Sequence, residues 1–257
     1  ARLQAELAGV FPALDEMLRW FAARQVRNRA TLGGNLGSAS PIGDLLPVLL
    51  ALDATVHCQG PRGNRALPID SYFQGYRRTA RAEDELITAV TLPRDPARRD
   101  AACKVAKRQS DDISIVVAAY ALAFDAAHRV SHARLAYGGV AATPMRATAT
   151  EAFLLGKVLD ASVIAACVGR LQAEFTPISD HRASADYRRR RCGTLCAGRA
   201  RGLVRWARST KAPSAMSPAA RSTPTSSTSR AASPACIRCR RRTRTRSCWR
   251  STSPLRA

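Results

Sequence analysis

The most informative segment of the sequence is FAARQVRNRATLGGNLGSASPIGDLLPVLLALDA, residues 21–54. Residues 29–48 are rich in Gly, Ser and Pro, so we expect a loop there, followed by an apolar run. Gly33 and Gly34 would let the backbone pass close to a bulky anion, and successive N–H groups in such a turn can form an anion-binding nest. The pattern is neither G-x-G-x-x-G nor a Walker A loop. Taken alone, it favours a structural turn over a ligand-binding loop.

Polar side chains in the same segment could nevertheless form hydrogen bonds to a ligand. Thr31, Asn35 and Ser38 offer hydroxyl and amide groups, and Asp44 could accept hydrogen bonds from ligand hydroxyls or amines.

The flanking sequence predicts a helix, then strands, then helices. Pro12 suits the first turn of a helix with apolar residues at i, i+3, i+4 and i+7, the last of them Phe21. A hairpin over 54–59 and 65–68 should be followed by strands at 86–92, 101–107, 113–124 and 130–138. This order favours an α+β fold over a doubly wound sheet.

Two helices are expected after the strands. Thr148 and Glu151 match a capping box before a short helix that Gly156 could end. Asp160 could cap the helix that follows.

The positive charge is concentrated at one end of the chain. The net charge is +22, yet every Asp and Glu lies at or before Asp186, and residues 188–257 hold 19 of the 41 Lys and Arg. Residues 1–187 therefore have a net charge of only +3. A charge confined to one tail argues against a nucleic-acid-binding function for the body.

The tail also differs in its codon classes. Twelve residue types have A or T at the second codon position; they number 88 in residues 1–187 and 7 in residues 188–257. This shift favours a tail that is read out of frame in GC-rich DNA over a naturally basic, disordered tail, which is the competing interpretation. On either interpretation we expect residues 191–257 to be disordered.

Six ordered segments resemble one family. QVRNRATLGGNLGSASPIGDLLPVLLAL (25–52) resembles the second flavin-binding loop of xanthine dehydrogenase-type molybdenum hydroxylases. SYFQGYRRTA (71–80), DELITAVTLP (84–93) and KVAKRQSDDISIV (104–116) resemble later segments of the same family, in the same order. LAYGGVAATPMRA (135–147) and FTPISDHRASADYR (175–188) resemble parts of the small C-terminal domain of these flavoproteins.

The resemblance implies a domain organisation. Residues 1–98 would form the second lobe of the FAD-binding domain, and residues 99–190 a small sheet-plus-helices C-terminal flavoprotein domain. Two departures accompany it. The family's FAD domain begins with another lobe, which carries a first Gly-rich phosphate loop, and this chain starts after that lobe. The family also continues past Tyr187 and Arg188 with an amphipathic helix, whereas RRRRCGTLCAGRARG stands here.

The resemblance also implies an electron-transfer role in an oxidoreductase. In such enzymes a molybdenum cofactor in another domain or chain oxidises the substrate, and electrons pass through 2Fe-2S clusters to FAD and then to NAD⁺. The cofactor does the chemistry, so no catalytic acid or base is expected in this chain. By position, the residues implied to contact FAD are Phe21, Thr31, Gly33, Gly34, Asn35, Ser38, Asp44, Ile87 and Lys104.

Those residues are given specific roles by the resemblance. Thr31 to Ser38 would line the phosphates and ribityl chain, and Asp44 would contact the nucleotide. Phe21 and Ile87 would lie against the flavin ring, and Lys104 would approach its polar edge. The loop at 108–112 would lie near the ring and could gate NAD⁺. Core packing alone would also explain Phe21 and Ile87, and a solvated surface position would explain Lys104.

The alternative function is a basic nucleic-acid-binding protein that uses the Arg-rich tail. Cys192, Cys196, Cys236 and Cys239 superficially suggest zinc, but the residues between the pairs offer no core to close around a metal, so no metal site is expected. The sequence has no apolar run long enough to span a membrane and no signal peptide, so we expect a cytoplasmic protein with no membrane partner.

Overall fold

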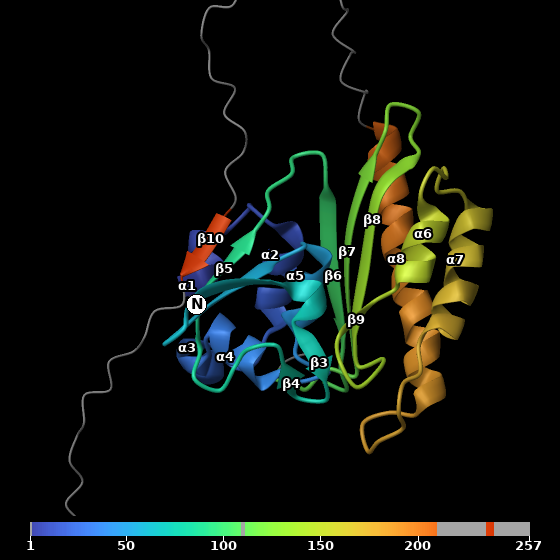
Figure 1. Cartoon of the computed structure of the whole chain (residues 1–257). Coiled ribbons are helices and arrows are strands. Elements are labelled where there is room, and N and C mark those ends of the chain that lie inside the picture. Colours follow the sequence, from blue (N-terminus) through green and yellow to red (C-terminus); the bar gives the residue numbers. More distant parts are fainter. Residues whose placement is uncertain (1, 109–110, 210–234, 239–257) are drawn as a thin grey trace, which may run out of the picture.

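Two four-stranded sheets organise the computed structural model, which describes residues 2–108, 111–209 and 235–238 (Figure 1). Short helices come first along the chain: α1 (Arg2–Glu6), α2 (Pro12–Trp20), α3 (Arg24–Arg29), α4 (Leu32–Ser38) and α5 (Leu46–Ala51). As predicted, α2 begins at Pro12 and buries Leu14, Met17 and Leu18. The carboxylate of Asp100 accepts a hydrogen bond from the N–H of Ala13 at 2.5 Å and so satisfies a donor in the first turn of α2.

The first sheet contains the predicted hairpin. Its strands are β1 (Thr55–Gly60), β2 (Gly63–Pro68), β5 (Leu86–Leu92) and β10 (Ala235–Arg238), in the order β10-β5-β1-β2. All neighbouring strands pair antiparallel. Between β2 and β5 lie a short 3₁₀ helix, η1 (Ile69–Ser71), and a two-stranded ribbon of β3 (Phe73–Gly75) and β4 (Arg78–Thr79).

The second sheet has the strand order β6-β7-β8-β9 and lies between two layers of helices. Its strands are β6 (Arg99–Val105), β7 (Val116–Phe124), β8 (Val130–Gly138) and β9 (Met145–Arg146). Figure 1 shows α6 (Thr148–Leu154), α7 (Ala161–Glu174) and α8 (Ala185–Ser209) on one side of this sheet and α2 and α5 on the other.

Strand β7 contributes to a hydrophobic core on each face of the second sheet. Val117 and Ala119 pack into the core shared with α2, α5 and the first sheet, whereas Val116, Ala118 and Tyr120 pack into the core under α6, α7 and α8. Successive side chains of a strand point to opposite faces, so a strand covered on both sides is apolar throughout. This explains the uninterrupted apolar run VVAAYALAF.

Two local predictions were wrong. The expected loop over residues 29–48 contains the helix α4, which begins after Thr31 because the Oγ of Thr31 accepts a hydrogen bond from the N–H of Gly34 at 2.9 Å. The expected capping box is absent. Thr148 is the first helical residue of α6, and Glu151 is buried, accepting hydrogen bonds from the N–H of Leu135 and from Arg146. The Asp160 cap of α7 is confirmed, since its carboxylate accepts from the N–H of Val163 at 2.8 Å.

The segment just after residue 190 is helical, in contrast to the expected disorder. Helix α8 continues to Ser209, and Cys192 and Cys196 are buried where α8 packs against α7. The fully buried Arg188 anchors this helix by donating to the carbonyl oxygens of Ile115 and Gly139 and to Asp180. Of the remaining predicted tail, residues 210–234 and 239–257 lie outside the described residues. None of the described helices is both long enough and apolar enough to cross a membrane.

Candidate cofactor-binding site

An open cleft of about 970 Å³ lies beside α4 and brings together four of the predicted site residues. Thr31, Gly33 and Gly34, at the start of α4, line this cleft together with Ile87 on β5. Its remaining lining residues come from α4, from the end of β1 and the turn that follows it, from the segment before β5 and from β5 itself: Gly37, Gln59, Gly60, Pro61, Arg81, Asp84, Glu85, Leu86 and Thr88. The cleft combines glycines with apolar side chains on β5, a combination suited to an extended ligand with a flat ring.

An ion-pair network holds the far side of this cleft. Arg65 donates to both carboxylate oxygens of Glu85, at 2.6 and 2.7 Å. That hydrogen bonding lowers the pKa of Glu85 to about 2, and the N–H of Ala82 adds to the effect. Arg81 donates to the carbonyl oxygens of Ala82 and Glu85 and so fixes the turn that enters β5. Arg81 is a cation on the cleft wall that the sequence analysis did not single out.

Two other predicted residues, Asp44 and Lys104, contact each other. The Nζ of Lys104 lies 2.7 Å from Oδ2 of Asp44 and 3.2 Å from the carbonyl oxygen of Trp20. The Oγ of Ser114 donates to Oδ1 of Asp44 at 2.5 Å. The Lys104 and Asp44 side chains are only 7% and 10% exposed, so Lys104 is not the solvated surface lysine that was the alternative.

Lys104 also lines a second cleft, of about 530 Å³. Glu16 and Trp20 of α2, the end of β6 and Arg191 of α8 form its walls, together with Asp111 and Asp112. The N–H of Arg108 donates to Asp112 at 2.8 Å, which lowers the pKa of that carboxyl group. Of the predicted gating loop 108–112, residues 109 and 110 lie outside the described residues.

The remaining predicted residues lie around α4 and at the end of α2. Phe21 follows the last residue of α2, where it is half-buried and packs against the first core. Ser38 is exposed, and its Oγ donates to the carbonyl oxygen of Asn35. The Oδ1 atom of Asn35 is buried and has no hydrogen-bond partner among the residues that the structure describes. Buried polar atoms are nearly always hydrogen-bonded, so this oxygen is available to a ligand donor.

The geometry as a whole fits FAD. The cleft beside α4 offers a wall of glycines, a cation and an apolar side chain, and an unpartnered amide oxygen lies next to it on the same helix. The structure divides the predicted residues into two groups: Thr31, Gly33, Gly34 and Ile87 line the first cleft, and Lys104, paired with Asp44, lines the second.

Within the described residues, no three His, Cys, Asp or Glu side chains gather as a metal site would require. Of the four cysteines considered for zinc, Cys192 and Cys196 face α7 and Cys236 belongs to β10, while Cys239 lies outside the described residues.

Two family profiles match almost the entire described chain. Residues 1–95 match the FAD binding domain in molybdopterin dehydrogenase, and residues 101–198 match the CO dehydrogenase flavoprotein C-terminal domain. The chain belongs to the FAD-binding flavoproteins of the molybdenum hydroxylases. The second match in this flavoprotein extends to residue 198, ten residues beyond the position where the codon classes change.

Relatives of this flavoprotein are oxidoreductases. It is 41% identical to xanthine dehydrogenase of Blastobotrys adeninivorans over 160 residues, which are 61% of this chain and 11% of that protein. It is also 41% identical to nicotinate hydroxylase of Emericella nidulans over 187 residues, 70% of this chain and 14% of that protein. The flavoprotein thus spans about a ninth to a seventh of the length of these curated relatives.

Solved structures support the same family and fold. A carbon monoxide dehydrogenase from Hydrogenophaga pseudoflava, in a form that lacks the Mo-pyranopterin moiety of the molybdenum cofactor, superimposes with a TM-score of 0.73 at 30% identity. The superposition covers 78% of this chain and 69% of that chain. The α+β fold of the molybdenum-hydroxylase flavoproteins, predicted from the sequence, is thereby confirmed.

Proposed function

We propose that this flavoprotein binds FAD in the cleft beside α4 and passes electrons from iron–sulfur clusters to NAD⁺, as a component of a xanthine dehydrogenase-like molybdenum hydroxylase. The observation that carries the proposal is the cleft itself, which has a volume of about 970 Å³ and is lined by Thr31, Gly33 and Gly34 together with Ile87. The partners proposed are the domains or chains that hold the 2Fe-2S clusters and the molybdenum cofactor, and the proposed location is the cytoplasm.

Each predicted residue then has a binding role. Thr31, Gly33 and Gly34 would hold the phosphates and ribityl chain, because the glycines leave their side of the cleft free of side chains. Asn35 and Ser38 would supply further polar contacts from the same helix. Ile87 and Phe21 would provide apolar surface for the ring. When bound, FAD would supply two-electron chemistry, accepting electrons from iron–sulfur clusters and delivering hydride to NAD⁺.

Asp44 and Lys104 would set the electrostatics beside the ring. Lys104 is held by Asp44 and by the carbonyl oxygen of Trp20, and it lines the second cleft. A fixed cation at that place would stabilise negative charge that develops on a ligand. The role proposed for Asp44 is therefore to hold Lys104 in place, in addition to any contact with the nucleotide.

Titration of FAD into the chain, followed by flavin fluorescence, tests the binding site. Gly34→Val should weaken binding at least tenfold, about 1.4 kcal/mol, because the added side chain points toward the Oγ of Thr31, 3.0 Å from an ideal Cβ. Gly169→Val on α7 is the matched control, since a Cβ there meets nothing within 4 Å. Equal affinities for the wild type and a folded Gly34→Val variant would contradict the placement of FAD.

The choice of electron acceptor needs its own test. NADH added without oxygen to the FAD-loaded chain should bleach the visible flavin absorbance, because hydride transfer is reversible. A chain that holds FAD and is bleached by dithionite, but not by NADH, would contradict NAD⁺ as the acceptor while leaving the FAD site intact.

A further inference from the structure

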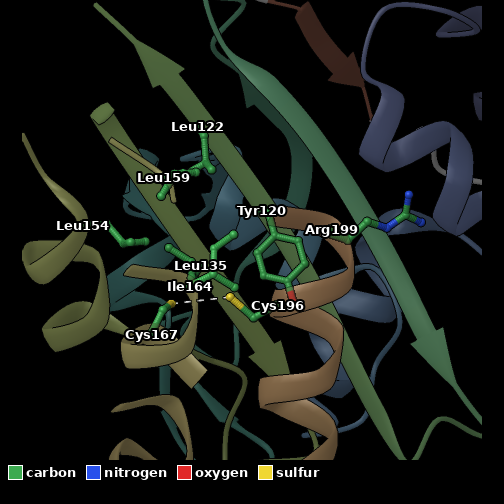
Figure 2. Close-up of a pocket in the computed structure, with 9 residues that line it drawn as sticks. All are labelled: Tyr120, Leu122, Leu135, Leu154, Leu159, Ile164, Cys167, Cys196 and Arg199. Carbon is green, nitrogen blue, oxygen red and sulfur yellow. Dashed lines mark hydrogen bonds between the residues drawn. The ribbon is translucent and has the colours of Figure 1, made fainter. Parts of the chain in front are cut away.

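Three cysteine thiols are buried at the contact between α7 and α8. Cys167 lies on α7, and Cys192 and Cys196 lie one turn apart on α8. The sulfur atoms of Cys167 and Cys196 are 3.5 Å apart, and Figure 2 shows them pointing toward each other from the two helices. This pair belongs to neither of the two clefts described above.

The two helix backbones approach closely beside this pair. An ideal Cβ at Gly193 would lie 2.7 Å from Cγ1 of Val168, so only a glycine fits there without a shift. Val168 is the neighbour of Cys167, and Gly193 lies one turn before Cys196. A disulfide requires its two Cα atoms to lie within about 4.4–6.8 Å of each other, so a bond between α7 and α8 depends on a close approach of the two helices.

A small cavity gives the sulfur atoms room to move and limits what can reach them. It holds about 20 Å³ and is lined mainly by apolar side chains, with both sulfur atoms on its wall (Figure 2). A single water molecule needs roughly 10–15 Å³, so a small oxidant is favoured over a bulky disulfide such as that of glutathione.

The hydrogen bond between the two thiols shifts their pKa values in opposite directions. It lowers the pKa of Cys167 and, with burial, raises the pKa of Cys196, as expected when Cys196 donates its S–H. Burial raises the pKa of Cys192 to about 12. Because the thiolate is the reactive form, Cys167 is the favoured nucleophile and Cys196 the resolving thiol.

We propose that Cys167 and Cys196 form a redox-sensitive pair that hydrogen peroxide converts to a disulfide joining α7 to α8. The Cys167 thiolate attacks one peroxide oxygen, the O–O bond breaks, and the departing hydroxide takes a proton and leaves as water. The Cys196 sulfur then attacks the sulfenic acid at Cys167, the S–O bond breaks, and a second water leaves. Two thiols are oxidised, and one peroxide is reduced to two waters.

Peptide mapping of the full chain tests the pairing. After peroxide treatment and alkylation of the remaining thiols, trypsin should release residues 158–170 linked to residues 192–199. The link joins residues 29 positions apart, so the oxidised protein should melt roughly 5 °C or more above the reduced protein, and dithiothreitol should reverse both changes.

Two cysteine variants distinguish this pair from its neighbour. Cys196→Ser should abolish the link, and Cys192→Ser, the matched control on the same helix, should retain it. The proposal is overturned if peroxide leaves Cys167 free to be alkylated. It is also overturned if residues 192–199 carry an internal disulfide instead, or if the link survives Cys196→Ser.

Discussion

At the scale of single residues, the buried contact among Asp44, Lys104 and Ser114 connects the segment before α5 to the end of β6 and to the segment before β7. Removing one member of a buried ion pair leaves the other charge uncompensated in a poorly solvated place. Ser114 contributes differently, since its hydroxyl satisfies an oxygen of Asp44 that Lys104 does not reach. The three residues therefore contribute to stability as well as to the proposed site.

Substitutions of Asp44 and Ser114 should lower the free energy of unfolding by different amounts. Asp44→Ala should lower the free energy of unfolding by about 3–5 kcal/mol, because Lys104 loses its buried partner. Ser114→Ala should cost about 1–3 kcal/mol, because one oxygen of Asp44 loses its donor. Urea denaturation measures both. Ser71→Ala removes only an exposed hydroxyl bond and is the control. A loss for Ser114→Ala no larger than that of the control would contradict this account.

The sequence could predict the residue types of the site but not their partners. Asp44 and Lys104 were recognisable as polar residues in family motifs, yet they are 60 positions apart, and their pairing depends on how α5 and β6 pack. Ser114 gave only a weak signal, a lone hydroxyl at the start of an apolar run. Arg81 was missed because its role comes from the turn that it fixes before β5.

At the scale of elements, α8 is where the sequence was most misleading. Its composition predicted disorder after residue 190, because Arg, Ala, Gly and Thr dominate and apolar periodicity is weak. The small side chains nevertheless let α8 approach α7 closely. Cys192 and Cys196 then serve as small buried hydrophobic residues. Similarly, α4 was read as a loop because three glycines lower its helix propensity, but the Thr31 cap and the burial of Leu32 and Leu36 outweigh that cost.

Replacing two glycines of α8 by alanine should change the stability of the protein in opposite directions. Gly193→Ala should destabilise the protein by about 1–3 kcal/mol, because the new Cβ would meet Val168 at 2.7 Å. Gly198→Ala, five residues further along the same helix, meets nothing within 4 Å and should stabilise it by about 0.5–1 kcal/mol. Urea midpoints measure both variants. Equal effects of the two substitutions would mean that α8 does not pack on α7 as described.

The start of α8 should also make the protein sensitive to acid. Burial alone would raise the pKa of Asp180, but hydrogen bonds from the N–H groups of Ala183 and Arg182 and from Arg188 together lower it to about 2. Because the pKa of Asp180 is lower in the folded protein than in the unfolded chain, where it is about 3.9, the ionised carboxylate stabilises the fold above that pH. This stabilisation is lost as the pH falls toward about 2.

Asp180→Asn should therefore flatten the fall in stability over that acidic range, as measured by urea midpoints at a series of pH values. Asp186→Asn is the control, because its ion pair with Arg189 is exposed and should add little to the pH dependence. An unchanged slope in Asp180→Asn would contradict the role given to this carboxylate.

At the scale of the whole molecule, the two segments matched by separate family profiles share a sheet surface. The second sheet begins at Arg99, yet one of its faces completes the core of the first segment through Ala102, Val117, Ala119 and Ala136. Its other face forms the core under α6, α7 and α8. The sequence predicted β6, β7 and β8 of this sheet but not the short β9, and Leu86–Leu92 and Val130–Gly138 match their predicted bounds. Sheet order and the sharing of faces depend on contacts between distant residues, which no local pattern specifies.

Because β7 belongs to both cores, the chain should unfold in a single cooperative transition. Neighbouring residues of β7 provide the test, since Val116 and Val117 are both fully buried but face opposite cores. Val116→Ala and Val117→Ala should each cost about 1–3 kcal/mol, and each should shift the whole transition. Circular dichroism and hydrogen exchange of amides in both sheets would follow the unfolding transition. If the segments unfolded separately, Val116→Ala would move only the transition of the second segment, and two midpoints would appear in the wild type. Coincident midpoints for all probes, shifted together by either substitution, are the result expected from a strand that holds both halves of the flavoprotein.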